Sequence, residues 1–431
     1  MLSATPGPMD SRYLWLRRDC GALGFSDLHR RLVAEIVAAV GILKGERAAE
    51  IVSASGLERM HMAIDSTDLG PLREIVIEKM RPDLLRMAVA IGRGLLRWTD
   101  EFYIDDYLIL RINFPYEVAR QGSSAGENPG IGRVSPGVRE LARSRRTVDP
   151  VYDPKSYHNN LPPAAWAHGP HQDSWAGHSK DGLNIWWAMC DTPAEAGMVL
   201  YPELAGKELP REPRTLYLKA GYTLPKPTLL PLAAGDMLIF DPEILHGTHL
   251  NVSPRTRVAV SLRLNAKRPR FSPDCFYARE FWRRASDIEQ GCFDAVLHLK
   301  REENLGAPPP PRTVEWPEPL RTIHAGYPED GAPIRIGSPS CLGENERVLV
   351  QLPDRRVLVQ RIDGALAAVD ARCPHYGIDL SDGAVDRDLA FCPGCGVAFN
   401  LFTGASSAPS LTLERIPVRE DDAGIHLLLP R

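Results

Sequence analysis

The chain has 431 residues, more than one hydrophobic core usually organises, so two or more domains are expected. Charged residues make up 25% of it and the formal net charge is −4, which argues against nucleic acid or an anionic membrane as a partner. The start of the chain lacks the pattern of a secretion signal, and no run approaches the roughly 18 apolar residues of a membrane span. We therefore expect a cytoplasmic protein that does not associate with membranes.

The first part of the chain is expected to form helices and then one or two strands. Residues 26–48 carry apolar side chains at helical spacing after Ser26, which is a suitable cap. Residues 70–98 are also helical in character, and Pro82 predicts a break into two successive helices. Residues 102–115 are rich in Tyr, Ile, Leu and Phe, which is typical of strands.

Residues 121–163 form a long segment rich in Gly, Ser, Asn, Pro and Arg, without a regular period. A segment of this kind is usually a lid over a functional site or a mobile insertion. Because it leads directly into the histidine-rich stretch at 168–175, we expect a lid. The mobile insertion stays open as an alternative.

Short β-prone runs separated by Gly, Pro and Asp come next and predict a β-sandwich or barrel. They lie at residues 183–190, 198–201, 216–219, 237–240 and 257–264. In the last run Val258, Val260, Leu262 and Leu264 share one face, while Arg257, Ala259, Ser261 and Arg263 share the other. We expect the first face to pack against a neighbouring layer and the second to line a cavity.

A proline-rich stretch at 305–319 indicates a boundary between two domains. We expect one domain over 1–304, a linker over 305–332 and a second domain over 333–431. The second domain is expected to contain strands at 348–352, 357–362 and 365–369. Asp363 and Gly364 between the last two strands are a strong signal for a hairpin.

The stretch His-Gly-Pro-His-Gln-Asp-Ser-Trp at 168–175 offers an imidazole and a carboxylate two residues apart. Side chains at i and i+2 of an extended segment project to the same side, so His171 and Asp173 can bind one metal ion. His246, which follows the apolar run 237–240, can supply a third ligand. Two histidines and one carboxylate on one face of an octahedron leave open positions, as in sites that hold Fe(II) for oxygen chemistry.

The motif His-x-Asp followed by His246 and Arg257 resembles the Fe(II)/2-oxoglutarate-dependent oxygenases, in particular their phytanoyl-CoA dioxygenase-like branch. The resemblance covers roughly residues 100–270 and includes Gly-Met-Val-Leu-Tyr-Pro at 197–202 and Ala-Gly-Asp-Met-Leu-Ile-Phe-Asp at 234–241. It implies a mostly β fold with flanking helices, organised as a double-stranded β-helix of the jelly-roll or cupin-like type. It also implies that His171, Asp173 and His246 bind the iron and are catalytic.

The same resemblance implies a reaction in which 2-oxoglutarate and O2 are consumed, succinate and CO2 are released, and a small molecule is hydroxylated or otherwise oxidised. Arg257 would bind the far carboxylate of 2-oxoglutarate, with Arg255 in reserve, since a guanidinium grips a carboxylate through two hydrogen bonds. Asn184 and Trp186 share one strand face and are expected to line the cavity, although a core position suits Trp186 equally well. The alternative is that the histidines are ordinary hydrogen-bonded residues and Arg257 is a surface charge.

A second motif lies near the end of the chain, where Cys373-Pro-His375 is followed by Cys392-Pro-Gly-Cys395. Eight cysteines are too few for a disulfide scaffold, and clustering with a histidine indicates a metal site. The motif resembles the Rieske ferredoxin domains, whose Cys-x-His and Cys-x-x-His loops carry a [2Fe-2S] cluster. The resemblance covers about residues 333–430 and implies a small all-β domain.

Cys395 stands where that family has its second histidine, so the resemblance implies a cluster bound by Cys373, His375, Cys392 and Cys395. Its potential is expected between about −400 mV, typical of all-cysteine clusters, and the range of about −150 to +300 mV of two-histidine clusters. A structural zinc site remains the alternative, because three cysteines and one histidine also suit tetrahedral Zn²⁺.

The favoured function is an Fe(II)/2-oxoglutarate-dependent dioxygenase that carries a Rieske-type domain with an electron-transfer or regulatory role. An electron-donating reductase is a further candidate partner. Two alternatives stay open: a Rieske non-heme oxygenase that does not use 2-oxoglutarate, and a non-catalytic metal-binding module with a structural zinc. No motif identifies the substrate.

Overall fold

The computed structural model describes residues 14–17, 24–121, 168–176, 178–179, 182–211, 218–219, 221–269, 282–295, 297, 320–329, 331–375 and 377–429. The predicted lid at 121–163 lies outside the described residues apart from its first position, and so does the proline-rich stretch at 305–319. Residues 216 and 217 of the predicted run at 216–219 are likewise outside them.

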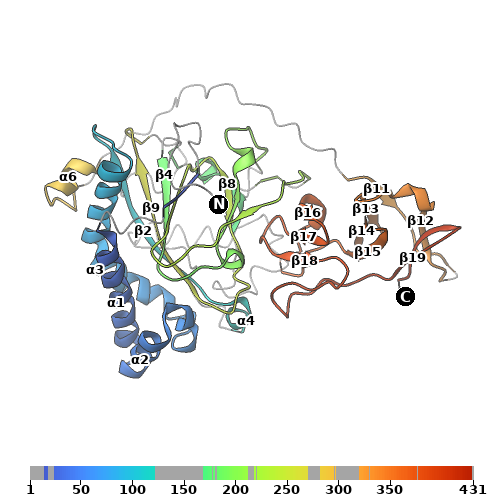
Figure 1. Cartoon of the computed structure of the whole chain (residues 1–431), viewed down its shortest axis with the longest axis horizontal. Helices are drawn as coiled ribbons and strands as arrows, with labels where there is room; N and C mark the ends of the chain where they lie inside the picture. The colour runs from blue at the N-terminus through green and yellow to red at the C-terminus, as the bar shows by residue number, and fades with distance from the viewer. Residues whose placement is uncertain are drawn as a thin grey trace.

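Three long helices near the start of the chain stand against one side of the barrel (Figure 1). They are α1 (Phe25–Lys44), α2 (Glu46–Ser55) and α3 (Leu69–Ala90), followed later by the short α4 (Tyr116–Ala119) and α6 (Ala285–Glu289). The helix predicted at 26–48 ends earlier, because Gly45 adopts φ 89°, outside the helical region, and separates α1 from α2.

The predicted break at Pro82 is wrong, since α3 runs through this residue as one helix and then passes into a π-helical turn at Ile91–Leu95. Proline within a helix costs about 3 kcal/mol or more. However, α3 buries Leu72, Ile77, Leu84 and Leu85 completely, and each large apolar side chain contributes roughly 1.5–3 kcal/mol on burial. Packing therefore outweighs the local penalty.

Two antiparallel sheets form the central barrel. The described part of the first has the order β1-β7-β4-β9-β2-β10 and that of the second the order β3-β8-β5-β6. The strands of the first are β1 (Leu14–Arg17), β7 (Met237–Phe240), β4 (Gly182–Ala188), β9 (Arg257–Asn265), β2 (Tyr103–Asn113) and β10 (Trp282–Arg284). Those of the second are β3 (His168–His171), β8 (Leu245–Thr248), β5 (Met198–Tyr201) and β6 (Thr228–Leu229).

The inner faces of the two sheets pack against each other. Trp186, Leu238 and Ala259 of the first sheet share one apolar cluster with Met198 and Leu200 of the second. This is the predicted double-stranded β-helix with flanking helices, and the fold prediction is confirmed.

Strand β9 has the two faces that its sequence predicts. Val258, Val260, Leu262 and Leu264 join the core that also contains the buried side chains of α1 and α3. On the other face, Ser261 and Arg263 line the cavity of the barrel. The alternation of one strand therefore separates the helix-facing core from the functional side of the sheet.

The remainder of the described chain forms three small sheets at the other side of the barrel (Figure 1). The first contains β11 (Thr322–His324), β13 (Arg347–Gln351), β14 (Arg356–Ile362) and β15 (Ala365–Asp370). The second contains β12 (Ile334–Gly337), β20 (Gly424–Leu427) and β19 (Val418–Asp421), and the third β16 (Val385–Asp386), β17 (Leu389–Phe391) and β18 (Ala398–Asn400).

Two details of this all-β part concern the predictions. The hairpin between β14 and β15 turns at Asp363 and Gly364, with φ 49° and 77°, as the Asp-Gly pair predicts. Strand β11 falls inside the range 305–332 predicted as a linker and pairs in parallel with β13. At least residues 322–324 therefore belong to the C-terminal sheet rather than to a linker.

None of the described helices combines the length and the apolar character that crossing a bilayer requires.

Candidate metal centres

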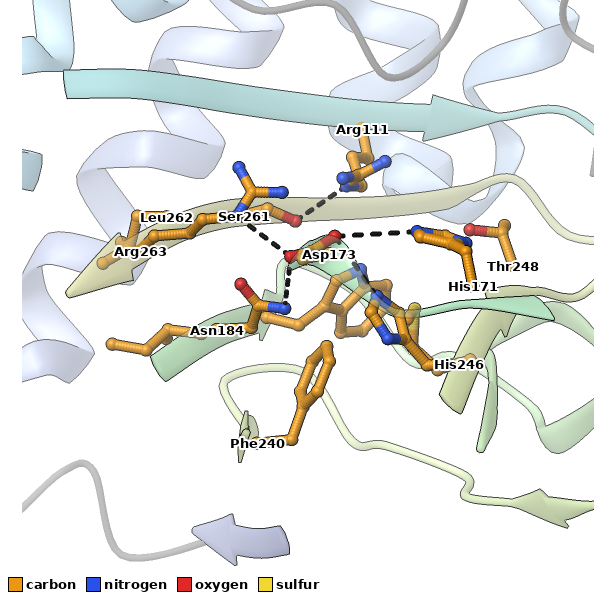
Figure 2. Close-up of a pocket in the computed structure, with 13 residues that line it drawn as sticks. Arg111, His171, Asp173, Asn184, Phe240, His246, Thr248, Ser261, Leu262 and Arg263 are labelled. Carbon is orange, nitrogen blue, oxygen red and sulfur yellow. Dashed lines mark hydrogen bonds and ion pairs between the residues drawn. The ribbon is translucent and has the colours of Figure 1, made fainter. Parts of the chain in front are cut away.

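The barrel contains a pocket between its two sheets. Its wall is made by Arg111, His171, Asp173, Asn184, Ile185, Trp186, Met198, Phe240, His246, Thr248, Ser261, Leu262 and Arg263. Figure 2 shows Asp173 among His171, His246, Asn184 and Arg263, and the ring of Phe240 lies beside that of His246, with 5.0 Å between centroids. The wall therefore combines polar groups that could bind an ion with apolar side chains that an organic molecule could contact.

Strand pairing brings the three predicted iron ligands together. His171 of β3 lies directly opposite His246 of β8 in the antiparallel register, and their ring centroids are 4.5 Å apart. Asp173 begins the 3-10 turn that follows β3. Its Oδ1 lies 3.6 Å from Nε2 of His171 and 3.8 Å from Nε2 of His246, close enough for all three atoms to bind one ion.

Backbone carbonyls orient both imidazole rings. Nδ1 of His171 lies 2.8 Å from the Gly169 carbonyl oxygen, and Nδ1 of His246 lies 2.8 Å from that of Ile244. Because a carbonyl only accepts, each Nδ1 carries the proton and donates it. Each Nε2 is therefore left with a lone pair that could bind an ion, and an outer hydrogen bond from Nδ1 is usual for metal-binding histidines.

The two oxygens of Asp173 have different surroundings (Figure 2). Oδ2 accepts hydrogen bonds from Nδ2 of Asn184 at 2.8 Å and from Nε of Arg263 at 3.2 Å. Oδ1 faces the two histidines. The carboxylate is thus held to offer one oxygen to a metal, which keeps other coordination positions open.

Charge and burial set the protonation states that a metal needs. Burial alone would raise the pKa of Asp173, but the positive charge of Arg263 holds it well below its usual value. Burial and the charge of His171 lower the pKa of His246 to about 4. At neutral pH the site therefore presents a carboxylate and a neutral imidazole, the forms that bind metal.

The arginines differ from the prediction. Arg255 is exposed, precedes β9 and does not line the pocket, so its reserve role has no support here. Arg257 is 2% exposed and lies behind the pocket wall, where it donates to the carbonyl oxygens of Ala196 and Gly197 and to Asn113. The arginine at the wall, besides Arg263, is Arg111.

The surroundings of Arg257 nevertheless leave its positive charge without a nearby negative charge among the described residues. Among the described residues it has no acidic partner, and its buried Nε makes no hydrogen bond. Burial and the neighbouring charge of Arg111 lower its pKa to about 9. A carboxylate placed near both guanidinium groups would offset this repulsion.

Two further predicted residues and some missed ones line the pocket. Asn184 and Trp186 both lie on its wall, as their shared strand face indicates. Arg111 was not predicted from the sequence as a pocket residue. Its position two residues after Ile109 places both side chains on the same face of β2. Thr248 and Phe240 had no sequence signal, because only the pairing of distant strands brings them here.

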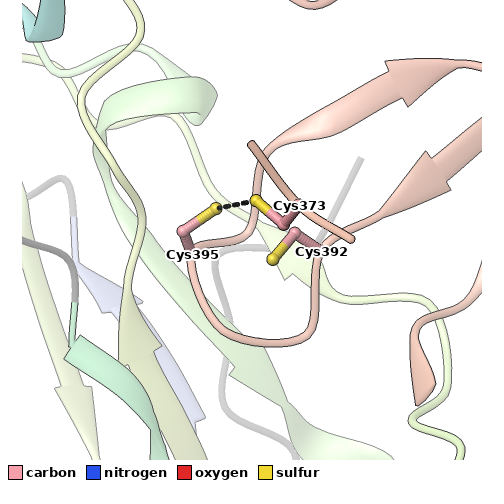
Figure 3. A group of neighbouring side chains, drawn as sticks. All are labelled: Cys373, Cys392 and Cys395. Atoms are coloured by element: carbon pink, nitrogen blue, oxygen red, sulfur yellow. Dashed lines mark hydrogen bonds between the residues drawn. The ribbon is translucent and has the colours of Figure 1, made fainter. Parts of the chain in front are cut away.

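The second centre lies at the edge of the third small sheet. Cys373, Cys392 and Cys395 are buried, unoxidised, and have sulfur atoms within 4.8 Å of one another (Figure 3). Sγ of Cys373 and Sγ of Cys395 are 3.7 Å apart. His375 is also buried but is not part of this group, and its ring packs edge-on against Tyr116 of α4.

Three thiols close together in an apolar environment suit a metal group. Burial raises the pKa of Cys392 and Cys395, so binding a metal must displace their protons. In a tetrahedral zinc site all four donor atoms lie close together around one ion. His375 does not belong to the group of donor atoms that lie within 4.8 Å of one another.

Comparison with known proteins agrees with this division. The family model of phytanoyl-CoA dioxygenase matches residues 133–259, and that of the Rieske [2Fe-2S] domain matches residues 333–415. Apoptosis-inducing factor 3 from Homo sapiens is 29% identical over 107 residues, and so is its counterpart from Mus musculus. This match covers 25% of the chain and only 15% of the length of these relatives.

Solved ferredoxins resemble part of the chain. The ferredoxin of carbazole 1,9a-dioxygenase from Nocardioides aromaticivorans IC177 is 21% identical, with a TM-score of 0.22, over 23% of this chain and 99% of its own. The Sphingomonas yanoikuyae B1 ferredoxin is 25% identical, with a TM-score of 0.22, over 23% of this chain and all of its own. By the two family models, the chain carries a domain of the phytanoyl-CoA dioxygenase family at residues 133–259, followed by a Rieske [2Fe-2S] domain at residues 333–415.

Proposed function

We propose that the protein is an Fe(II)/2-oxoglutarate-dependent dioxygenase that oxidises a small molecule, with its Rieske-type domain, proposed to span 333–431, as an electron carrier. The observation that carries this proposal is the geometry around Asp173. Two imidazole nitrogens and one carboxylate oxygen converge within 4.8 Å at the wall of a pocket that is also lined by apolar side chains. The matching family model supports a dioxygenase-type oxidoreductase.

In this proposal His171, Asp173 and His246 hold the ferrous ion, which supplies the capacity to bind and activate O2. Asn184 and Arg263 restrain the carboxylate, and the carbonyls of Gly169 and Ile244 restrain the rings. These residues thereby fix one face of the coordination sphere. The remaining positions are left for the keto acid and for O2.

We assign the far carboxylate of 2-oxoglutarate to the region between Arg111 and Arg257. Arg111 lines the pocket beside Ser261, whose Oγ accepts a hydrogen bond from Nε of Arg111 at 2.8 Å. Arg257 adds a buried positive charge without an acidic partner among the described residues. A dicarboxylate that reaches from the metal to these guanidinium groups would be bound at both ends.

The substrate would lie against the apolar part of the wall, which includes Trp186, Met198 and Phe240. These side chains also exclude water from the reacting region. In the C-terminal domain, Cys373, His375, Cys392 and Cys395 would bind a [2Fe-2S] cluster. The family match supports such a cluster, and the three gathered thiols support the cysteine assignments.

Succinate release measured together with O2 uptake tests the proposal. Protein loaded anaerobically with Fe(II) should release succinate from 2-oxoglutarate on exposure to O2, and a screen of small molecules should find compounds that stimulate this release. Asp173→Ala should abolish it, because one of three ligands is lost. Asp191→Ala is the matched control, since this exposed carboxylate accepts only from Ala234 N, outside the pocket.

A second candidate is an oxygenase that takes its electrons from the Rieske-type domain and uses no keto acid. The hydrogen bond between Leu250 of the barrel and Cys395 of the Rieske-type domain favours this second candidate, because it brings the two domains into contact. The same experiment separates the two candidates. Substrate oxidation that requires an electron donor and yields no succinate would overturn the first candidate and support the second.

A further inference from the structure

Strands β5 and β8 form one wall of the barrel, and the two faces of this wall make different contacts. Their inner side carries Met198, His246 and Thr248, which line the pocket. Their outer side carries Val199, Tyr201 and Leu245, which belong to a separate apolar cluster. The candidate iron ligand His246 therefore belongs to a strand whose opposite face is available for contact with another part of the chain.

The cysteine loop of the C-terminal domain lies directly against this outer side. The backbone N–H of Leu250 donates to the carbonyl oxygen of Cys395 at 2.9 Å. Gly396 is so close to the wall that a Cβ atom on it would lie 2.7 Å from Cγ2 of Val199 and 2.8 Å from Cδ2 of His249. Figure 3 shows the three cysteines beside the ribbon of the barrel. Only a glycine allows this approach.

Other contacts hold the loop in this position. The ring of His375 packs edge-on against Tyr116 at 5.4 Å between centroids, and Tyr116 N donates to the carbonyl oxygen of Asn251 at 2.7 Å. Asp382 accepts hydrogen bonds from Gly221 N and, through its carbonyl, from Leu224 N, both at 2.8 Å. The interface is thus built at several separate points.

The interface is also apolar. Leu250 and Val252 of the barrel belong to the same continuous buried cluster as Cys373, Cys395 and Val397 of the C-terminal domain. His249, which follows β8 and is not among the residues that line the pocket, is 2% exposed. Apolar continuity of this kind is expected for a fixed contact rather than for a transient encounter.

From these contacts we propose that the segment 246–250 and the loop 395–396 form an electron-transfer junction within one chain, through which the Rieske-type domain reduces the iron of the barrel. This inference rests on the proposed function, since it requires both metal centres. The route runs along the main chain from residue 246 to residue 250, four residue steps that span on the order of 13 Å if extended. It then crosses the hydrogen bond between Leu250 and Cys395.

The step is a transfer of one electron. The singly reduced cluster loses an electron and returns to its oxidised form, while ferric iron at the barrel site gains it and becomes ferrous. No bond between heavy atoms forms or breaks. The cluster is recharged by an external one-electron donor of the flavoprotein reductase class. A thiolate at position 395 in place of imidazole lowers the cluster potential and so favours donation.

The test uses the full chain with both metals bound and the barrel iron oxidised. One electron equivalent is introduced photochemically, and the EPR signals of the reduced cluster and of ferric iron are followed in rapidly frozen samples. We expect both signals to disappear together, at a rate that does not depend on protein concentration. A reduced cluster that persists beside ferric iron, or a rate that rises in proportion to concentration, would overturn the junction.

Variants locate the junction. Gly396→Ala places a methyl group against Val199 and His249, and Val199→Phe adds bulk from the barrel side, away from the cysteines. Gly364→Ala is the matched control, because Gly364 has the same φ of 77° and no atom within 4 Å of its Cβ position. Hydrogen exchange of the Leu250 amide reports whether the interface has opened.

We expect the transfer rate to fall in each variant that loses protection at Leu250, and to remain at the wild-type value in Gly364→Ala. Transfer that does not follow the protection of Leu250 across these variants would refute the assigned route. The outcome is separable from that of the proposed function. Normal electron transfer without succinate release contradicts the keto acid reaction alone. A chain that binds neither the barrel iron nor the cluster contradicts both proposals.

Discussion

The hydrogen bond between Asn184 and Asp173 gives a quantitative test of the barrel site. Asn184→Leu keeps the volume of the side chain but removes the Nδ2 donor that lies 2.8 Å from Oδ2 of Asp173. Arg263 remains as the second donor at 3.2 Å. Loss of such an outer partner typically weakens metal binding about 10–100-fold, or about 1.4–2.7 kcal/mol.

The assay is an anaerobic titration of the metal-free chain with Fe(II), with Co(II) as a visible probe for the same site. Asn265→Leu is the matched control, because Asn265 is also a buried amide and donates to Ser179, away from the metal ligands. Both variants should lose some stability against unfolding, since each leaves a buried polar group with one partner fewer. Only Asn184→Leu should lose metal affinity.

Equal affinity in Asn184→Leu and wild type would refute the reasoning, provided that Asp173→Ala still abolishes binding. Such a result would mean that the orientation of the carboxylate does not depend on Oδ2. A parallel loss in Asn265→Leu would equally contradict it, since the effect would then come from general destabilisation of the barrel.

Three further predictions concern charge. Arg111→Met and Arg257→Met should each raise the KM for 2-oxoglutarate more than they lower kcat, because each removes a positive charge from the proposed carboxylate site; steady-state succinate assays with unchanged KM in both variants would contradict this. Burial raises the pKa of Asp105 to about 6. As pH rises from about 4 to 6, Asp105 therefore ionises in the unfolded chain before it does in the folded one, and the free energy of unfolding falls by about 3 kcal/mol over this window. Asp105→Asn should remove this loss in denaturant titrations at pH 4 and pH 7, and an unchanged pH dependence would refute the raised pKa. Cys395→His should move the cluster potential toward about −150 to +300 mV and make it pH-dependent, and an EPR-monitored redox titration identical to wild type would show that residue 395 is not a ligand.

Local sequence patterns accounted for much of the barrel and for the grouping of residues within strands. The alternation in 257–264 correctly separated the helix-facing side of β9 from the cavity side. The spacing of His171 and Asp173 placed them near one another, and the β8 register then brought His246 opposite. At Pro82 the local rule failed, because the buried side chains of α3 outweigh the cost of one proline.

Features that depend on tertiary contact had no local signal. Arg255 and Arg257 are close in sequence, yet the first is exposed and the second is buried, because β9 begins only at Arg257. Arg111 reaches the pocket only through the pairing of β2 with β9. The contact between Gly396 and the outer side of β5 joins segments from two different domains. No periodicity or motif in either segment could have predicted it.

The most direct test of the central claim is the anaerobic addition of 2-oxoglutarate to the Fe(II)-loaded chain, followed by visible absorption. If His171, Asp173 and His246 hold one ferrous ion with adjacent open positions, a charge-transfer band of the chelated keto acid should appear with one equivalent of iron and should be absent in Asp173→Ala. A band of equal intensity in Asp173→Ala, or no band in iron-loaded wild type, would contradict the account.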